Sequence, residues 1–217
     1  NAVEKGQDLS VSGTSANLAE GTVVTVTLNG KNYTATTAAD GTWSLTVPAA
    51  DLAGLGQANY TLNATATNGV GNSVSNTANL LVDTALPTVT INTVAGEDVI
   101  NLAEHSQAHI ISGTATGAAA GDKVTVTIGG QTYTTVLDAA GNWSVGVPAS
   151  VISGLSDGTV TVTASVTDAA GNTGTGSHNV TVDTGLPSVA FNAISGDNVL
   201  NAVEKGQDLS VSGTSAN

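Results

Sequence analysis

Short runs of apolar, mostly β-branched residues alternate with polar residues between positions 84 and 183. Alternation with a period of two is typical of strands that bury one face. It predicts seven strands, at about 88–94, 108–115, 123–129, 131–137, 142–148, 158–167 and 173–182. Glycines mark the turns between them, as at Gly129-Gly130, where a tight hairpin is expected. Pro148 ends the fifth strand, and one helical turn is expected within 149–155.

These strands predict an all-β fold with two packed sheets. No helical pattern alternates with them, and a single antiparallel sheet would leave one apolar face in water. The composition agrees, because 40% of the residues are hydrophobic and β-branched types are abundant. Trp43 and Trp143 each lie in a strand just after a turn. Core packing is therefore favoured for both over a role as ligand-stacking platforms.

The chain repeats itself every 100 residues, because residues 1–17 recur unchanged at 201–217 and Asn101-Leu102-Ala103-Glu104 stands midway. A period of this length matches one small domain per repeat rather than a solenoid unit. The segments 83–87 and 183–187 are the expected linkers, each ending in a proline that starts the next first strand. We therefore expect three parts: a domain lacking its first strand at 1–83, a complete domain at 84–183, and the first two strands of a third domain at 184–217.

This division predicts two kinds of partner. Neighbouring repeats of one chain are expected to contact each other across the short linkers. In addition, the strand near 188–194 has no sandwich of its own, and the first domain has a vacant position for such a strand. Head-to-tail strand exchange between two copies is therefore expected. The repeat pattern also indicates a piece of a longer protein, whose targeting information is expected elsewhere.

Charge and cysteine content exclude several classes of function. Seventeen carboxylates face four basic side chains, giving a net charge of −13, so the basic patch that nucleic acid binding requires is not available. No apolar run is long enough to span a bilayer, and no membrane insertion is expected of this segment. Cysteine is absent, which rules out disulfides and thiol chemistry. No enzyme is expected, since no acid–base pair or nucleophile triad is visible.

Carboxylates concentrate at both ends of the predicted sandwich. The leading end, where the first strand enters, carries Asp138 and Asp168. The trailing end carries Glu97, Asp98, Glu104 and Asp183. In an array, the trailing end of one domain faces the leading end of the next, which would bring Glu4 and Asp83 towards the leading-end pair. Clustered carboxylates and amides suit Ca²⁺; merely solvated acidic turns are the alternative, which stays open.

Four motifs complete the pattern: Asp-Thr-x-x-Pro at 83–87 and 183–187, an acidic loop ending in Asn-x-x-Glu at 96–104 and 196–204, Gly-x-Trp-Ser-x-x-Val-Pro at 41–48 and 141–148, and Asp-Ala-Ala-Gly-Asn at 168–172. Together they resemble the bacterial immunoglobulin-like repeats of giant type I-secreted RTX adhesins of biofilms. The resemblance implies tandem seven-stranded immunoglobulin-like sandwiches. It also implies a secreted extender region that projects a distal binding domain from the bacterial cell surface.

The resemblance further implies Ca²⁺ at the domain joints. The ligand residues that it carries over to this sequence are Asp83, Glu97, Asp98, Asn101, Glu104, Asp138, Asp168, Asp183, Asp197 and Glu204. Asn68 stands where the second repeat has Asp168, so the corresponding site of the first repeat is expected to be weaker.

Two other hypotheses carry less weight. Repeats that themselves bind a glycan, a host protein or a surface are the main alternative to a spacer, although aromatic residues for such a binding face make up only 3% of the chain. His105 and His109 are four residues apart, but a zinc site would need them on a helix or on facing strands together with further ligands, and they stand where the predicted loop enters the strand at 108–115. Solvated histidines are therefore the favoured interpretation.

Overall fold

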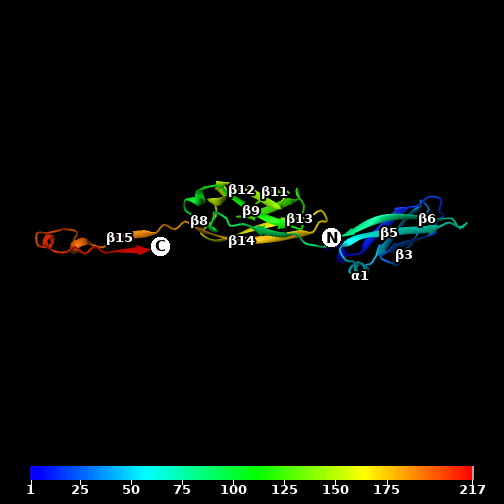
Figure 1. Cartoon of the computed structure of the whole chain (residues 1–217), viewed down its shortest axis with the longest axis horizontal. Coiled ribbons are helices and arrows are strands. Elements are labelled where there is room, and N and C mark those ends of the chain that lie inside the picture. The colour runs from blue at the N-terminus through cyan, green and yellow to red at the C-terminus, as the bar shows by residue number, and fades with distance from the viewer. Residues whose placement is uncertain (217) are drawn as a thin grey trace.

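The computed structural model describes residues 1–216. An N-terminal sandwich, a central sandwich and a C-terminal hairpin follow one another along the long axis of the molecule (Figure 1). Most of the regular structure is strand, which confirms the predicted all-β class. No helix among residues 1–216 is long and apolar enough to cross a membrane.

The central sandwich consists of two facing sheets. The larger sheet has the strand order β11-β10-β13-β14-β8, in which β8 joins β14 in parallel. The smaller sheet has the antiparallel order β12-β9-β7. The bounds of these strands are β7 Thr88–Ile91, β8 Val99–Asn101, β9 His109–Thr116, β10 Lys123–Ile128, β11 Gln131–Val136, β12 Asn142–Val147, β13 Gly158–Thr167 and β14 Thr173–Asp183. Two short helices, η2 (Glu104–Ser106) and α2 (Ala149–Ile152), pack together at the trailing end.

The N-terminal sandwich follows the same plan with fewer strands. One sheet pairs β1 (Leu9–Thr14) with β4 (Thr42–Val47), and the other has the order β3-β2-β5-β6. The bounds of the latter are β2 Val23–Leu28, β3 Lys31–Thr36, β5 Ala58–Thr67 and β6 Ser73–Val82, and the helices are η1 (Glu4–Gly6) and α1 (Ala49–Leu52). In the central sandwich β9 pairs with both β12 and β7, whereas within residues 1–216 its counterpart β1 pairs only with β4.

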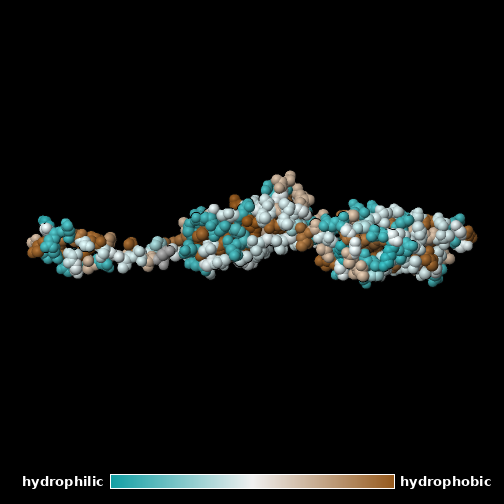
Figure 2. All heavy atoms as spheres, turned by 60° about the horizontal axis from the view of Figure 1, so that its bottom comes forward, coloured by the Kyte–Doolittle hydropathy of each residue, from teal (hydrophilic) through white to brown (hydrophobic). Residues whose placement is uncertain are grey.

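The C-terminal segment is a hairpin without a second layer. In it, β15 (Ser188–Phe191) pairs antiparallel with β16 (Gly213–Ala216), and the intervening loop holds η3 (Ile194–Gly196) and η4 (Glu204–Gly206). Hydrophobic side chains lie on the surface of this segment (Figure 2). Val189 and Phe191 are 82% and 76% exposed.

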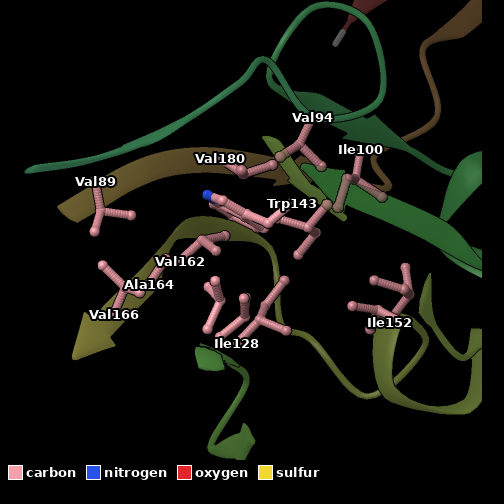
Figure 3. Close-up of a cluster of buried hydrophobic side chains, with 14 of the residues drawn as sticks. Val89, Val94, Ile100, Ile128, Trp143, Ile152, Val162, Ala164, Val166 and Val180 are labelled. Carbon is pink, nitrogen blue, oxygen red and sulfur yellow. The ribbon is translucent and has the colours of Figure 1, made fainter. Parts of the chain in front are cut away.

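The core of the central sandwich lies between its two sheets and consists of the inward-facing residues of alternating strands. Trp143 lies at its centre, among Val94, Val162 and Val180 (Figure 3). Trp143 is 3% exposed, and Trp43 packs half-buried against the N-terminal core. The core interpretation of both tryptophans is confirmed.

The central sandwich contains all seven predicted strands, and the predicted helical turn is α2. The largest difference is in β7, which ends at Ile91 instead of continuing to residue 94. The eighth strand, β8, was not predicted, because three residues inside an acidic loop show no alternation. Its position is set by pairing with β14 rather than by a local pattern.

Strand β7 crosses close over β14 because two positions of β14 lack side chains. A Cβ atom at Gly174 or at Gly176 would overlap main-chain oxygens of the incoming linker and of β7. The close approach lets Val89 reach the core. The first repeat has larger residues, Val74 and Asn76, at the equivalent positions of β6.

Asp98 ties the loop after β7 to β14. Its Oδ1 accepts hydrogen bonds from the main-chain N–H of Val94 (2.8 Å) and from Nε2 of His178 (2.7 Å). The bond from Val94 and then the bond from His178 hold the pKa of Asp98 below its ordinary value. Asn198 accepts the same main-chain bond in the C-terminal segment, from Ile194. An amide is therefore sufficient for the loop, and within the central sandwich the carboxylate adds its interaction with the histidine.

We predict that Asp98→Asn destabilises the central sandwich by about 1 kcal/mol at neutral pH, because it weakens a partly exposed charge-assisted bond and keeps the loop. A carboxyl with a lowered pKa stabilises the fold fully above its unfolded pKa and loses that effect as the pH falls through the folded pKa. The difference between wild type and variant should therefore shrink below about pH 4. Denaturant unfolding followed at Trp143 in a Trp43→Phe background measures it, and an equal difference at pH 7 and pH 3 would contradict the assignment.

Candidate functional site

The joint between the two sandwiches is held by a buried asparagine. Asn172 lies in the β13–β14 turn at the leading end of the central sandwich and is 3% exposed. Its Oδ1 accepts a hydrogen bond from the main-chain N–H of Ala2 (2.8 Å). Its Nδ2 donates to the main-chain oxygen of Asp83 (3.0 Å). One side chain thus binds both the first residues and the last residue of the N-terminal sandwich.

Asp168 fixes the orientation of this asparagine. Its Oδ1 accepts a hydrogen bond from the main-chain N–H of Asn172 (2.8 Å), and its Oδ2 accepts one from Nδ2 of the same residue (3.0 Å). Desolvation raises the pKa of Asp168, but the bonds donated by Asn172 outweigh it and leave the pKa below the ordinary value. The carboxylate is therefore ionised at neutral pH, at the joint itself.

A second copy of this turn lies in the same sandwich, and its side-chain hydrogen bonds stay within the turn. In Asp138-Ala139-Ala140-Gly141-Asn142, the Asp138 carboxylate accepts bonds from the main-chain N–H groups of Ala140 and Asn142 and from Nδ2 of Asn142. These bonds lower the pKa of Asp138, the main-chain bond from Asn142 most of all. The Asp-Ala-Ala-Gly-Asn sequence is thus a self-bonded turn, and within residues 1–216 only the copy at 168–172 forms hydrogen bonds with the other sandwich.

The recurring Asn-x-x-Glu sequence forms a reciprocal cap. Oδ1 of Asn101 accepts bonds from the N–H groups of Ala103 and Glu104, and Oε2 of Glu104 accepts one from the N–H of Asn101. The same arrangement occurs at Asn1 with Glu4 and at Asn201 with Glu204. This is the logic of a capping box at the start of a short helix. It gives a structural reason for these residues to recur, beside the predicted role as ligands.

The other predicted ligand residues lie in loops or at the ends of strands. Oδ1 of Asp83 and of Asp183 accepts the N–H two residues later, from Ala85 and Gly185. Oδ1 of Asp197 accepts the N–H of Val199, and Glu97 is exposed. Of the ten residues, the joint brings together Asp83 and Asp168, with the Asn1–Glu4 cap alongside. Residues 1–216 contain no group of three or more histidine or acidic side chains arranged to hold a metal ion.

Sequence reasoning missed the central role of Asn172. The residue was visible as the last position of the Asp-Ala-Ala-Gly-Asn motif, which occurs at 138–142 and at 168–172. Only the second copy precedes β14, the strand that lies against the linker at Pro87. Gly171 contributes as well, because a Cβ atom there would lie 3.1 Å from Nδ2 of Asn1. The small residue leaves room for the neighbouring domain.

The two histidines differ from the prediction of solvated side chains. Both are half-buried, and Nε2 of His105 lies 2.9 Å from the main-chain oxygen of Leu155. Nε2 of His109 lies 3.0 Å from the main-chain oxygen of Glu104. Each ring thus ties η2 or its neighbouring strand to main chain, because the loop folds back onto the trailing end of the sandwich.

The model of the bacterial Ig-like domain family matches residues 9–84 and 87–184. The chain belongs to this family. The two matches fall on the N-terminal and central sandwiches described above. This bacterial Ig-like chain therefore contains two copies of the domain in tandem. No curated protein matches the chain in sequence.

Two solved structures of bacterial adhesins are similar over the whole of this bacterial Ig-like chain. One is a Ca²⁺-stabilised adhesin that helps an Antarctic bacterium to reach out and bind ice: 39% identity, TM-score 0.55, 100% of this chain and 54% of that chain. The other is a 1.5-MDa bacterial ice-binding adhesin studied for host cell surface retention: 32% identity, TM-score 0.53, 100% and 71%. The chain therefore spans about half of the first structure. The predicted resemblance to Ig-like repeats of large adhesins is confirmed.

We predict that Asn172→Ala loosens the joint, because it leaves the Ala2 N–H and the Asp83 carbonyl without their partner. The loss should destabilise the docked arrangement by about 1–3 kcal/mol. Asn142→Ala is the matched control, since it removes the equivalent amide from a turn that stays within one sandwich.

The measurement is a pulsed electron–electron distance distribution between spin labels at Thr61→Cys and Thr163→Cys, which are specific because the chain contains no cysteine. The distribution should broaden in Asn172→Ala and stay narrow in Asn142→Ala. Equal widths in both variants would show that the asparagine does not hold the joint.

Proposed function

We propose that this chain is part of the extender region of a large bacterial cell-surface adhesin, and that its repeats act as spacers. The observation that carries the proposal is the joint: a short linker and a buried asparagine hold consecutive sandwiches in line (Figure 1). The similarity to two large adhesins, at 39% and 32% identity, supports it. We also propose the division into 1–83, 84–183 and 184–217 as the repeat structure of this region.

The function of such an array would be to provide length. The longest strands, such as β13 with ten residues, lie roughly along the molecular axis and span roughly 33 Å. Each further repeat moves a distal domain outwards by at least this distance. The spacer needs no reaction chemistry, and we propose that the chain is not an enzyme. Its neighbours are repeats of the same chain, and we propose a secreted, type I-exported protein at the cell surface.

Calcium fits the joint between the sandwiches. The donors there are all hard oxygens, from the Asp168 carboxylate, the Asp83 linker and the Asn1–Glu4 cap. The chain has four basic side chains against seventeen acidic ones, and none of the hydrogen bonds above pairs these acids with a lysine. The first similar adhesin is Ca²⁺-stabilised. Bound Ca²⁺ would supply positive charge and further coordination bonds, while Asp168 and Asn172 would position the two sandwiches.

The remaining ligand assignments extend this proposal to other joints. The trailing end of the central sandwich carries the same kinds of oxygen donor on its cap and exit strand. The oxygen donors of the next repeat lie in the C-terminal segment. The proposed ligands there are Glu97, Asp98, Asn101, Glu104, Asp183, Asp197 and Glu204, with Asp138 at the leading end. Asn68 replaces the aspartate at the leading end of the first repeat, so we propose a weaker site there.

We predict that Ca²⁺ binding raises the melting temperature of the chain, because a ligand that binds only the folded state stabilises it. Asp168→Asn should weaken the tightest site about tenfold or more, since it removes one carboxylate from the site. Asp40→Asn is the control, because Asp40 lies in a turn of the N-terminal sandwich and bonds only to Thr42.

Titration calorimetry with CaCl₂ on wild type and both variants gives the affinities. If the titration shows no heat of binding and a chelator leaves the melting temperature unchanged, the calcium proposal is wrong. The spacer proposal would not be affected by that result. Weakening by Asp40→Asn to the same extent would place the site away from the joint.

A further inference from the structure

A turn of five residues that ends in Gly-Asn occurs three times in the two sandwiches. In the two copies of the central sandwich, at 138–142 and 168–172, the first residue is aspartate. The third copy, at 68–72, joins β5 to β6 at the leading end of the N-terminal sandwich and begins with Asn68. Its main chain closes in the same way, because the N–H of Asn68 donates to the oxygen of Asn72 (2.9 Å). An asparagine thus lies in a turn that elsewhere holds an aspartate.

Two main-chain donors hold the side-chain oxygen of Asn68. Its Oδ1 accepts hydrogen bonds from the N–H of Val70 (3.1 Å) and from the N–H of Asn72 (2.9 Å). Donors in this position polarise the side-chain carbonyl, and they stabilise the negative charge that forms on Oδ1 when a nucleophile adds to Cγ. This is the principle of an oxyanion hole. The turn therefore makes Cγ of Asn68 more electrophilic than the same atom of an asparagine without such bonds.

The main-chain nitrogen of Gly69 is a nucleophile within the same turn. The hydrogen bond from Val70 closes an Asx turn, a ring that contains both Cγ of Asn68 and this nitrogen. Gly69 is exposed, and a Cβ atom at its position would meet no atom beyond its chain neighbours within 4 Å. Glycine also permits the widest range of main-chain angles. Base from solvent can therefore reach the Gly69 N–H, and the main chain can rotate to bring the nitrogen onto Cγ.

We propose that Asn68 is a site of spontaneous deamidation, and that the folded turn converts this asparagine to aspartate. The nitrogen of Gly69 loses its proton to solvent base and adds to Cγ, which places the negative charge on Oδ1. Nδ2 then takes up a proton and leaves as ammonia, and a succinimide ring remains. Water adds to Cγ and breaks its bond to the Gly69 nitrogen. Water is consumed and ammonia released in equal amounts, with no oxidation or reduction.

The chain already contains the structure of the product in its other two turns. There, Oδ2 of the aspartate accepts a hydrogen bond from Nδ2 of the asparagine that ends the turn, at 3.1 Å for Asp138 and 3.0 Å for Asp168. At 68–72 the atom in place of Oδ2 is Nδ2 of Asn68, which is a donor and cannot accept this bond. Deamidation therefore supplies the acceptor that the terminal asparagine uses in the other two turns.

The closed turn also selects which bond of the succinimide water breaks. Attack at Cγ restores the ordinary main chain and gives aspartate, whereas attack at the main-chain carbonyl of residue 68 gives isoaspartate. Isoaspartate lengthens the main chain by a methylene and turns the carbonyl that accepts the N–H of Gly71 (3.0 Å) into a side-chain carboxylate. Because aspartate keeps the bonds of the turn, we expect it to be the main product in the folded chain.

A second Asn-Gly pair in the same chain serves as an internal reference. Asn29 and Gly30 form the tight turn between β2 and β3, with φ angles of 49° and 78°. The residues on either side, Leu28 and Lys31, pair with each other in the sheet and hold this turn. Within residues 1–216, Oδ1 of Asn29 has no main-chain donor. The dipeptide is the same at both sites, but only Asn68 has the polarised carbonyl.

Conversion at Asn68 has a consequence for calcium, which rests on the proposed function, whereas the conversion itself does not. An aspartate at this position gives the leading end of the N-terminal sandwich the carboxylate that Asp168 gives to the central sandwich. Carboxylate oxygens are preferred Ca²⁺ ligands, and the amide has a weaker oxygen donor without charge. This repeat would therefore gain its ligand after folding, and its calcium binding would increase with the age of the protein.

Mass spectrometry on the full chain, kept folded at mildly alkaline pH and sampled over time, tests the conversion. Digestion after Lys31 separates the two Asn-Gly pairs. The peptide with Asn68 should gain the mass that separates a carboxyl from an amide at least about tenfold faster than the peptide with Asn29. In denaturant the two rates should become similar, because the hydrogen bonds to Oδ1 are lost. Gly69→Ala should slow the conversion at least about tenfold, since a Cβ restricts the rotation.

Isoaspartyl methyltransferase labelling of the same peptides identifies the product. The aged Asn68 peptide should carry mainly unlabelled aspartate. Equal rates at Asn68 and Asn29 in the folded chain, no conversion at Asn68, or a product that is wholly isoaspartate would overturn the proposal.

Titration calorimetry with CaCl₂ on Asn68→Asp tests the consequence separately. This variant should bind an additional Ca²⁺, or bind it about tenfold more tightly than wild type, because it supplies the missing carboxylate. Asn29→Asp is the matched control: it adds the same charge to the other Asn-Gly turn, at the opposite end of the same sheet. Identical titrations of Asn68→Asp and wild type would refute the calcium consequence, whereas the mass measurement decides the conversion on its own.

Discussion

Packing of the first strand, β7, at the edge of the smaller sheet and against β14 of the larger sheet is the interaction on which the central sandwich depends. In the central sandwich, Val89 of β7 closes the core beside β9 and β14, and two glycines of β14 allow the strand to approach. The strand enters directly from the linker that leaves the preceding sandwich. The central sandwich is therefore completed by a segment that begins at its neighbour, so the packing of its core also fixes where the preceding sandwich is attached.

The joint follows from that arrangement. Because β7 is paired almost as soon as the linker ends, the linker has few residues with which to bend. Asn172 then binds the chain on both sides of the joint, at Ala2 and at the Asp83 carbonyl. Asp168 holds the asparagine and contributes a negative charge. The short linker and the turn at Asp168–Asn172 thus both restrict the joint between the two sandwiches.

Much of the fold could be predicted from the sequence, because alternation and glycine turns are local signals. The seven strands and the buried Trp143 rest on such signals alone. Strand β8 could not be predicted, since its three residues are placed by β14 and not by their own pattern. The joint was predicted in outline, from acids at opposite ends of one repeat. Asn172 escaped notice because its partners are main-chain groups 170 and 89 residues away, which leave no trace in a single sequence. The Asn-x-x-Glu pattern was interpreted only as ligands, although its spacing is also that of a capping box.

The central claim is that the repeats form a stiff spacer. Small-angle X-ray scattering, at dilution low enough to keep molecules apart, tests it most directly on chains with none, one or two further copies of residues 84–183 inserted after Asp183. The account predicts that the maximum dimension grows by the same increment for each copy, at least about 33 Å. Growth that falls off with each copy, as the square root of chain length for a flexible string of domains, would contradict it.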